Sequence, residues 1–236
     1  LIVTPPSVEF KIVRNNDTEI IIRNPSEIEK YTDIKHLMEK YCEVNLLFPK
    51  EYLVSIMQLL IEKRGTQEDL NYLSTSMVKV RYKLPLLELV SGFYDTLKSI
   101  SQGFASLDYE ILDFEKGNLV KLDILVNGQI IDSFSSILAK ENAEFVGRNR
   151  VKKLSELIPR QQFDIPIQAA VGSRIIARET IKALRKDVTA KLYGGDVTRK
   201  RKLLEKQKEG KKKMRQIGKV NVPKDCLLYT SPSPRD

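Results

Sequence analysis

The sequence is poor in the residue types that build metal and catalytic centres, because its 236 residues include one histidine, two cysteines and no tryptophan. Cys42 and Cys226 lie far apart in dissimilar surroundings, and with His36 they cannot supply a zinc site of the usual spacing. The same scarcity argues against a disulfide framework and favours a reducing compartment. We therefore expect a cytoplasmic chain without a metal site.

Long apolar runs and targeting signals are absent as well. No run approaches the roughly 20 residues that a helix needs to cross a bilayer. The start, Leu1 to Pro6, lacks both a methionine and the layout of a signal peptide. We interpret it as sequence from within a longer protein and expect an upstream part. The chain is long enough for one large domain or two small ones.

Catalytic motifs are missing too: neither G-x-x-x-x-G-K-[ST] nor G-x-G-x-x-G occurs. His36 lies in a polar connector, and the sequence shows no acidic or nucleophilic partner with which it could form a catalytic pair. Cys42 precedes an apolar strand, where a cysteine is more often a core residue than a nucleophile. Asp108 and Glu110 share one face of a strand-like run and could hold a metal, but a solvated strand face is the more common role. We expect no active site.

Charge is unevenly distributed along the chain. The net charge is +9, but residues 148–215 contain 21 lysines and arginines against seven acidic residues, a net of +14. The remainder therefore carries −5. A basic third joined to a mildly acidic remainder predicts a module that binds a polyanion, nucleic acid before anionic membrane. A lysine-rich surface that is merely solvated is the alternative.

The apolar pattern predicts an α+β fold. Alternation over residues 8–14 and 19–23 predicts a hairpin, which we assign to the end of a preceding domain over residues 1–35. Residues 36–125 then show the order strand, helix, strand, strand, helix, strand, which is typical of a ferredoxin-like split β-α-β sandwich. The predicted elements are Glu43–Phe48, Glu51–Lys63, Leu70–Leu73, Val78–Leu84, Leu86–Ile100 and Phe104–Phe114.

Residues 126–225 are predicted to form a basic α+β domain, and a hairpin signal over Asn118–Ile131, around Asn127-Gly128, spans its start. A turn at Leu192–Asp196 offers Asp196 or Thr198 as a helix cap, and we expect a basic loop over residues 195–215. The other predicted elements are a helix at Gly147–Leu157, a strand at Phe163–Ala170 and a helix at Arg174–Lys186.

The stretch Arg199–Arg215 holds ten positive charges and only two acids, Glu205 and Glu209. Like charges at i,i+4 repel, so we expect this stretch to be mobile alone and to become ordered when phosphates neutralise it. Binding to a membrane surface needs an apolar face, which two leucines and a methionine supply poorly.

We therefore predict RNA contacts for the basic side chains of this third of the chain, although ordinary solvation explains any single one about equally well. They are Arg148, Lys152, Arg160, Arg174, Arg178, Arg185, Lys186, Lys191, Arg199, Lys200, Arg201, Lys202, Lys206, Lys208, Lys211, Lys212, Lys213 and Arg215. Arg150, Lys153 and Lys182 extend the same face.

Several segments of the sequence resemble the C-terminal half of the LepA family, also called elongation factor 4, of ribosomal translation GTPases. The segments are Arg160–Ile165, Gln168–Ala170, Ile176–Thr180, Lys182–Lys186, Tyr193–Asp196 and Arg199–Lys212. Upstream, Glu62–Gly65 and Gly103–Tyr109 resemble the domain shared with elongation factor G. The resemblance extends from about Ile2 to Asp225.

The resemblance implies a domain order: the end of a third domain, an elongation-factor-G-type C-terminal domain over residues 36–125, and a LepA-specific domain. The implied partners of a monomeric chain are the ribosome, through ribosomal RNA of the large subunit, and transfer RNA. The parent would hydrolyse GTP with Mg²⁺ in a domain outside this chain, acting in back-translocation or fidelity, so no enzyme activity and no cofactor are expected here. A large-subunit assembly factor, a protein peripheral to the inner membrane, and an organellar origin are alternatives.

The last residues depart from the family's pattern. After Val222–Asp225 the family usually continues with an apolar ending, whereas residues 226–236 back-translate plausibly to a transposase-type sequencing adapter. We expect this tail to be translated adapter, which would leave Cys42 as the only genuine cysteine.

Overall fold

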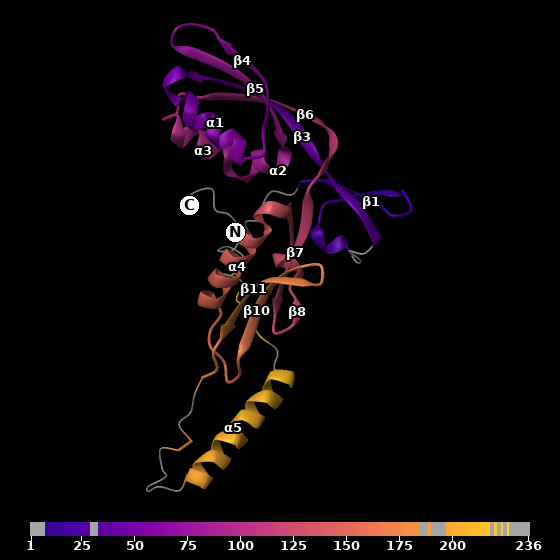
Figure 1. Ribbon diagram of the computed structural model, residues 1–236, viewed down its shortest axis with the longest axis vertical. Helices are drawn as coiled ribbons and strands as arrows, with labels where there is room; N and C mark the ends of the chain where they lie inside the picture. Colours follow the sequence, from indigo (N-terminus) through magenta and orange to yellow (C-terminus); the bar gives the residue numbers. More distant parts are fainter. Residues whose placement is uncertain are drawn as a thin grey trace. The chain divides into compact units, whose positions relative to one another are not determined.

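The computed structural model (Figure 1) describes residues 8–28, 33–184, 188–189, 197–217, 220, 223 and 226, with the side chains of 215–217 excepted. The chain forms two compact units that divide between Leu119 and Val120. Each contains an antiparallel sheet with helices, so the predicted α+β class is confirmed. Within the described ranges, no helix combines the length and apolar character needed to cross a membrane.

The first unit is built on one long strand, β3 (Ile34–Pro49). The sheet order is β2-β1-β3-β5-β4, with β6 on the other edge of β3. The first residues of β3 pair with β1 and the later ones with β5, so the confirmed hairpin joins this sheet. The assignment of residues 1–35 to a preceding domain stays a prediction. The other strands are β1 (Phe10–Arg14), β2 (Glu19–Ile22), β4 (Thr66–Tyr72), β5 (Met77–Pro85) and β6 (Ser106–Gly117).

Helices occupy the two predicted places, which gives the split β-α-β order. The first is α1 (Leu53–Glu62), and the second begins with α2 (Leu86–Glu88) and ends with α3 (Tyr94–Ile100). The prediction of one continuous helix over Leu86–Ile100 is wrong. Residues 89–93 form a π-helical turn, and Ser91 and Gly92 leave helical geometry there, with Gly92 at a φ of 78°. That left-handed conformation suits glycine, which has no Cβ.

The core of this unit lies between the helices and one face of the sheet. Val44, Leu46 and Phe48 alternate along β3 and are fully buried, as the period of two in a strand requires. The pairing of β3 with β6 shifts between Lys40 and Cys42. Such a bulge changes the phase of the strand, and therefore Leu37 and Glu39 are buried at odd positions and the core residues at even ones.

A buried ion pair joins β3 to the end of α1. Glu39 is fully buried, and its two carboxylate oxygens accept hydrogen bonds from Arg64 Nη1 at 2.7 Å and Nη2 at 3.1 Å. Arg64 Nε also donates to Glu88 at 3.2 Å. Burial alone lowers the pKa of the Arg64 guanidinium, but its hydrogen bonds and the charges of Glu39 and Glu88 outweigh that effect and raise it. The pair is thus bidentate and charge-matched.

Arg64 holds this position at a conformational cost. The N–H of Arg64 donates to Ile61 O and that of Gly65 to Leu60 O, which is the double hydrogen bond of a Schellman helix end. Arg64 occupies the left-handed position of this motif, with φ at 60°, where glycine is usual. Gly117 closes the site from β6, because a Cβ there would lie 2.5 Å from Glu39 Oε1.

The second unit has the sheet order β11-β10-β7-β8, with β9 also paired to β7. The turn at Asn127-Gly128 is confirmed, and both residues have positive φ, as a two-residue hairpin requires. The helix α4 (Ala143–Leu157) packs on β10 and β11. The strands are β7 (Leu119–Val126), β8 (Gln129–Ile130), β9 (Ser136–Ala139), β10 (Ile165–Val171) and β11 (Arg174–Ile181).

The prediction of a helix over Arg174–Lys186 is wrong, because residues 174–181 form β11, antiparallel to β10. Ile175, Ile176, Thr180 and Ile181 are β-branched, which favours a strand. Gly172, with φ at 58°, turns the chain back onto β10. Of the remaining predicted residues, Lys182 and Leu184 lie after the strand, and residues 185–186 are outside the described part.

We expect Arg64→Met to lower the free energy of unfolding by about 3–5 kcal/mol, since it leaves Glu39 buried without its cation. The matched control is Arg81→Met. Arg81 is half-exposed and lies 3.6 Å from Glu68, and such surface pairs contribute about 1 kcal/mol or less. Urea unfolding followed by circular dichroism measures both. Equal losses in the two variants would contradict the importance of the buried pair.

Candidate nucleic-acid interface

The basic stretch is a helix, α5 (Val197–Ile217), so the prediction of a loop over 195–215 is wrong. Lysine, arginine, leucine, glutamate and glutamine are strong helix formers, and their summed propensity outweighs like-charge repulsion of a few tenths of a kcal/mol per pair. Arg201 and Glu205 add an i,i+4 ion pair at 3.3 Å. Thr198 lies inside the helix and does not cap it. Residues 192–196 lie outside the described part.

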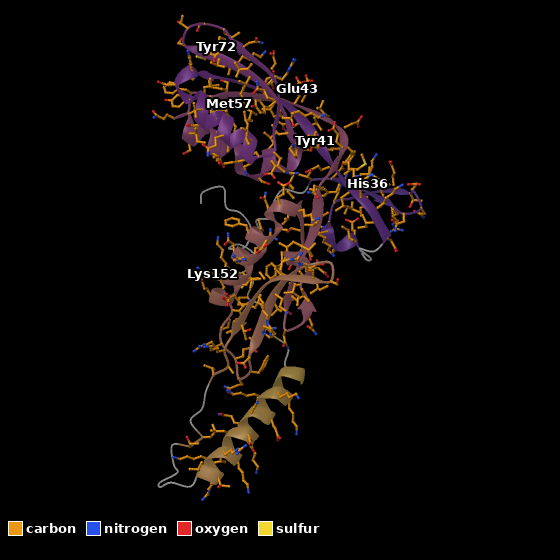
Figure 2. The ribbon with its side chains drawn as sticks, viewed as in Figure 1. His36, Tyr41, Glu43, Met57, Tyr72 and Lys152 are labelled. Atoms are coloured by element: carbon orange, nitrogen blue, oxygen red, sulfur yellow. The ribbon has the colours of Figure 1, made fainter. Side chains whose placement is uncertain are left out.

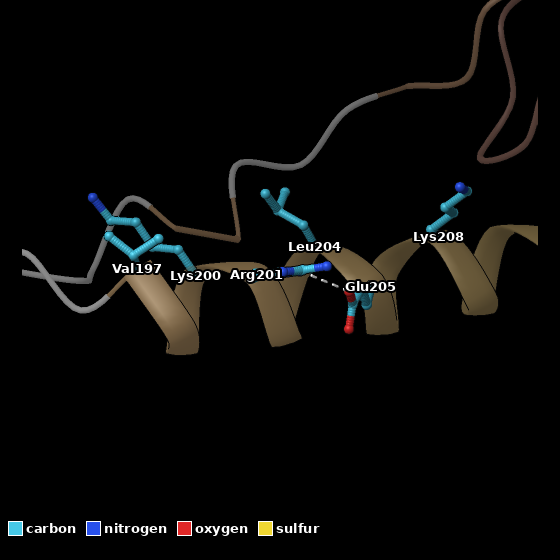
Figure 3. A pocket seen from close by; sticks show the side chains of 6 residues that line it. All are labelled: Val197, Lys200, Arg201, Leu204, Glu205 and Lys208. Carbon is cyan, nitrogen blue, oxygen red and sulfur yellow. Dashed lines mark hydrogen bonds and ion pairs between the residues drawn. The ribbon is translucent and has the colours of Figure 1, made fainter.

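The α5 side chains are almost all exposed, and the few exceptions among residues 197–214 are only half-buried. An open hollow on one face of α5 is lined solely by the helix's own residues, Val197, Lys200, Arg201, Leu204, Glu205 and Lys208 (Figure 3). Val197 is 74% exposed and Leu204 53%. A hollow formed by one face of a single helix encloses nothing, so α5 offers a charged surface and no ligand cavity there.

A second basic group lies on α4. Gly147 faces the sheet so closely that a Cβ would lie 3.1 Å from Ala169 Cβ and from Ile176 Cδ1. Val151 and Leu154 are buried on the same side. This packing turns most of the intervening polar residues outward, and three basic ones, Arg148, Lys152 (Figure 2) and Lys153, are exposed.

Further predicted residues surround α4. Arg160 follows the helix, Arg174 and Arg178 lie on β11, and Lys182 follows that strand; all four are exposed. Because α4 packs on β11, the structure brings these two elements together. The predicted residues thus fall into one group on α4 and β11 and another on α5. Arg185, Lys186 and Lys191, and the side chain of Arg215, lie outside the described residues.

Arg150 differs from its neighbours on α4. Its guanidinium points inward, where Nη1 donates to Ser136 Oγ at 2.6 Å and to Phe134 O at 3.3 Å. Burial lowers the pKa of Arg150. The side chain therefore fastens the start of β9 and the residues just before it to α4, and it is a poor candidate for an RNA contact. In the sequence, Arg150 lies four residues from both Val146 and Leu154, and this helical spacing places it on the inward side of α4.

The candidates for chemistry are dispersed. His36 lies in β3 opposite Val13, so its placement in a polar connector is wrong (Figure 2). Asp108 and Glu110 are exposed on β6. Cys42 is fully buried, its thiol donates to Leu84 O at 3.3 Å, and burial raises its pKa to about 11. No group of three or more potential metal ligands occurs among the described residues.

Comparison with known proteins gives two family matches. The family described as elongation factor G C-terminus matches residues 36–125, and that described as GTP-binding protein LepA C-terminus matches residues 126–230. Two curated relatives from Clostridium botulinum, strains 657 and Hall, both named elongation factor 4, are 50% and 49% identical over 228 residues. The alignment covers 97% of this chain but only 38% of each relative's length.

A crystal structure of a protein from Thermus thermophilus aligns over 34% of this chain and 12% of that one, with 18% identity and a TM-score of 0.32. The LepA match runs to residue 230, past Cys226, which is buried in the core of the second unit. The adapter origin of residues 226–236 stays a prediction.

We expect the Cys42 thiol to react very slowly with a disulfide reagent at pH 8 in the folded chain. A pKa of about 11 leaves roughly one thiolate in a thousand at that pH. The measurement uses a Cys226→Ala background and follows release of the chromophore, with urea-unfolded chain as control. Rapid reaction before unfolding would show that Cys42 is not a core residue.

Arg150 and Arg148 provide a matched pair on α4. Arg150→Met removes two hydrogen bonds of a buried cation, so we expect a stability loss of about 1–3 kcal/mol and unchanged RNA affinity. Arg148→Met breaks only an exposed pair with Glu144, so stability should stay within about 0.5 kcal/mol while RNA affinity falls. Thermal unfolding and filter binding to ribosomal RNA measure the two quantities. The opposite pattern would assign the RNA contact to Arg150.

Proposed function

The chain belongs to the LepA family by its LepA C-terminal match over residues 126–230 and its relatives named elongation factor 4, and on this premise we propose that it is the RNA-binding part of a ribosomal translation factor. Its ligands would be ribosomal RNA of the large subunit and transfer RNA. The ferredoxin-like domain would dock on the large subunit, and the basic surfaces of the second unit would hold phosphates. The chain would contribute binding and positioning, and GTP hydrolysis would belong to another part of the whole factor.

The observation that carries the proposal is the exposure of α5. Eight of its lysines and arginines are exposed: Arg199, Lys200, Arg201, Lys202, Lys206, Lys208, Lys212 and Lys213. Exposed cations on a helix attract phosphates and release the counterions condensed on RNA, which gives affinity without reading sequence. Phosphate contacts of this kind fix the position of a protein on its RNA.

The distribution of apolar residues on α5 argues against a membrane as the ligand. A helix that lies in a lipid interface needs one continuous bulky apolar face. Leu203 and Met214 lie on one side of α5, whereas Leu204 lies about 100° further round with Val197, among lysines and arginines. The helix therefore offers charge on several sides and no continuous apolar face.

The test is replacement of all eight exposed cations by glutamine in the full chain. We expect affinity for ribosomes and for transfer RNA to fall by two orders of magnitude or more at 0.1 M salt, and the salt slope to shrink by up to about 6. Equilibrium binding at several salt concentrations measures both. Anionic vesicles serve as a third ligand, and loss of vesicle binding alone would indicate a membrane protein.

The double variant Glu205→Gln and Glu209→Gln is the matched control on the same helix, because it changes the net charge in the opposite direction. It removes two negative charges, so RNA affinity should rise severalfold. If neutralising the eight cations leaves ribosome and transfer-RNA binding unchanged, the proposed role of α5 is wrong. A full-length factor stimulated only by ribosomal precursors, and not by mature ribosomes, would indicate an assembly role.

A further inference from the structure

The exposed cations of α5 form two rows on nearly opposite sides of the helix. At about 100° per residue, their mean directions differ by about 155°. The first row comprises Lys200, Arg201, Lys208 and Lys212, and the second comprises Arg199, Lys202, Lys206 and Lys213. Figure 3 shows the side of α5 that carries Lys200 and Lys208 of the first row. Lys211 is half-buried and lies between Lys200 and Lys208 around the helix, within the span of the first row.

Each row is separated from the other by residues of a different kind. Glu205 and Glu209 lie between the rows on one side of the helix. On the other side the positions at i, i+4, i+7 and i+11 carry no charge: Leu203, Gln207, Gly210 and Met214. A uniformly basic helix would have cations in both of these intervals, so the exposed positive charge of α5 is confined to the two rows.

The width of the helix decides what the two rows can bind. A helix with its side chains is about 10–12 Å across, and the ammonium and guanidinium groups stand at its outer surface. At 0.1 M salt, charges interact weakly beyond about 10 Å. A single phosphate backbone lying along one row is therefore too far away to neutralise the other row. Within the first row, Arg201 is already partly neutralised by its ion pair with Glu205.

We propose that α5 lies between two phosphate backbones of folded RNA and that each row binds one of them. This inference rests on the proposed RNA-binding function and specifies its ligand. The ligand is RNA in which two backbones run side by side, as in a helical stem or at the junction of two stems. A single strand offers one backbone, so on such a strand either row can replace the other.

Three variants of the full chain test the proposal. Glutamine replaces the four residues of the first row, the four of the second, or all eight, so that the two single-row variants lose equal charge. Glutamine is about as good a helix former as lysine and arginine, and circular dichroism checks the helix. Arginine in place of the lysines of each row keeps the charge and should retain binding.

The probes are a folded transfer RNA and oligouridylate of similar length. On transfer RNA, each single-row variant should lose affinity on the order of tenfold to a hundredfold at 0.1 M salt, and its salt slope should fall by up to about 3. On oligouridylate each single-row variant should lose only a few-fold, because the remaining row suffices. The eight-residue variant should lose binding to both.

The outcomes separate the two proposals. If one single-row variant binds transfer RNA like the unaltered chain, α5 contacts RNA from one side and the inference is overturned, while RNA binding by α5 stands. If both single-row variants lose as much on oligouridylate as on transfer RNA, only total charge matters, and the inference is again overturned. If the eight-residue variant binds transfer RNA normally, the proposed function itself fails.

Discussion

The pair formed by Glu39 and Arg64 is the constraint on which the first unit depends. It joins the central strand to the end of α1, and Glu88 and Gly117 bring α2 and β6 to the same point. A buried carboxylate without a partner costs several kcal/mol, so these elements can meet only with the arginine in place. The left-handed backbone of Arg64 costs on the order of 1 kcal/mol, which the pairing outweighs.

The two units differ in how far their surface cations are balanced by nearby acidic residues. In the first unit, many surface cations are matched by acids close by, as with Lys40 and Arg23 on Glu9, whose pKa falls to about 2 through hydrogen bonds from both. In the second unit, basic residues outnumber acids, and α4 turns its exposed cations away from the sheet. The sheet thus serves as a support that keeps these cations at the surface.

Much of the fold was predictable because its pattern is local, as the alternation along Glu43–Phe48 and the turn at Asn127-Gly128 show. The isoleucines of residues 174–181 fit the apolar spacing of a helix as well as that of a strand. Only pairing with the neighbouring strand β10 decides between helix and strand. For α5, the charge pattern predicts a mobile loop, but the summed helix propensity of the whole segment exceeds the repulsion between its like charges. The candidate interface was predictable as a set of charges but not as an arrangement, since the inward direction of Arg150 depends on Ser136 and Phe134. Contacts between distant segments are the part that a pattern along the chain does not contain.

The exposure of α5 has a consequence for how this part of the protein can change over evolutionary time. No described side chain of the helix is fully buried, so packing does not decide which residue stands at which position. In β7 and β10, by contrast, Leu122, Ile124 and Ile167 are fully enclosed and tolerate few alternatives. Packing therefore does not account for the resemblance of Arg199–Lys212 to the LepA family, so the constraint on these residues lies outside the fold.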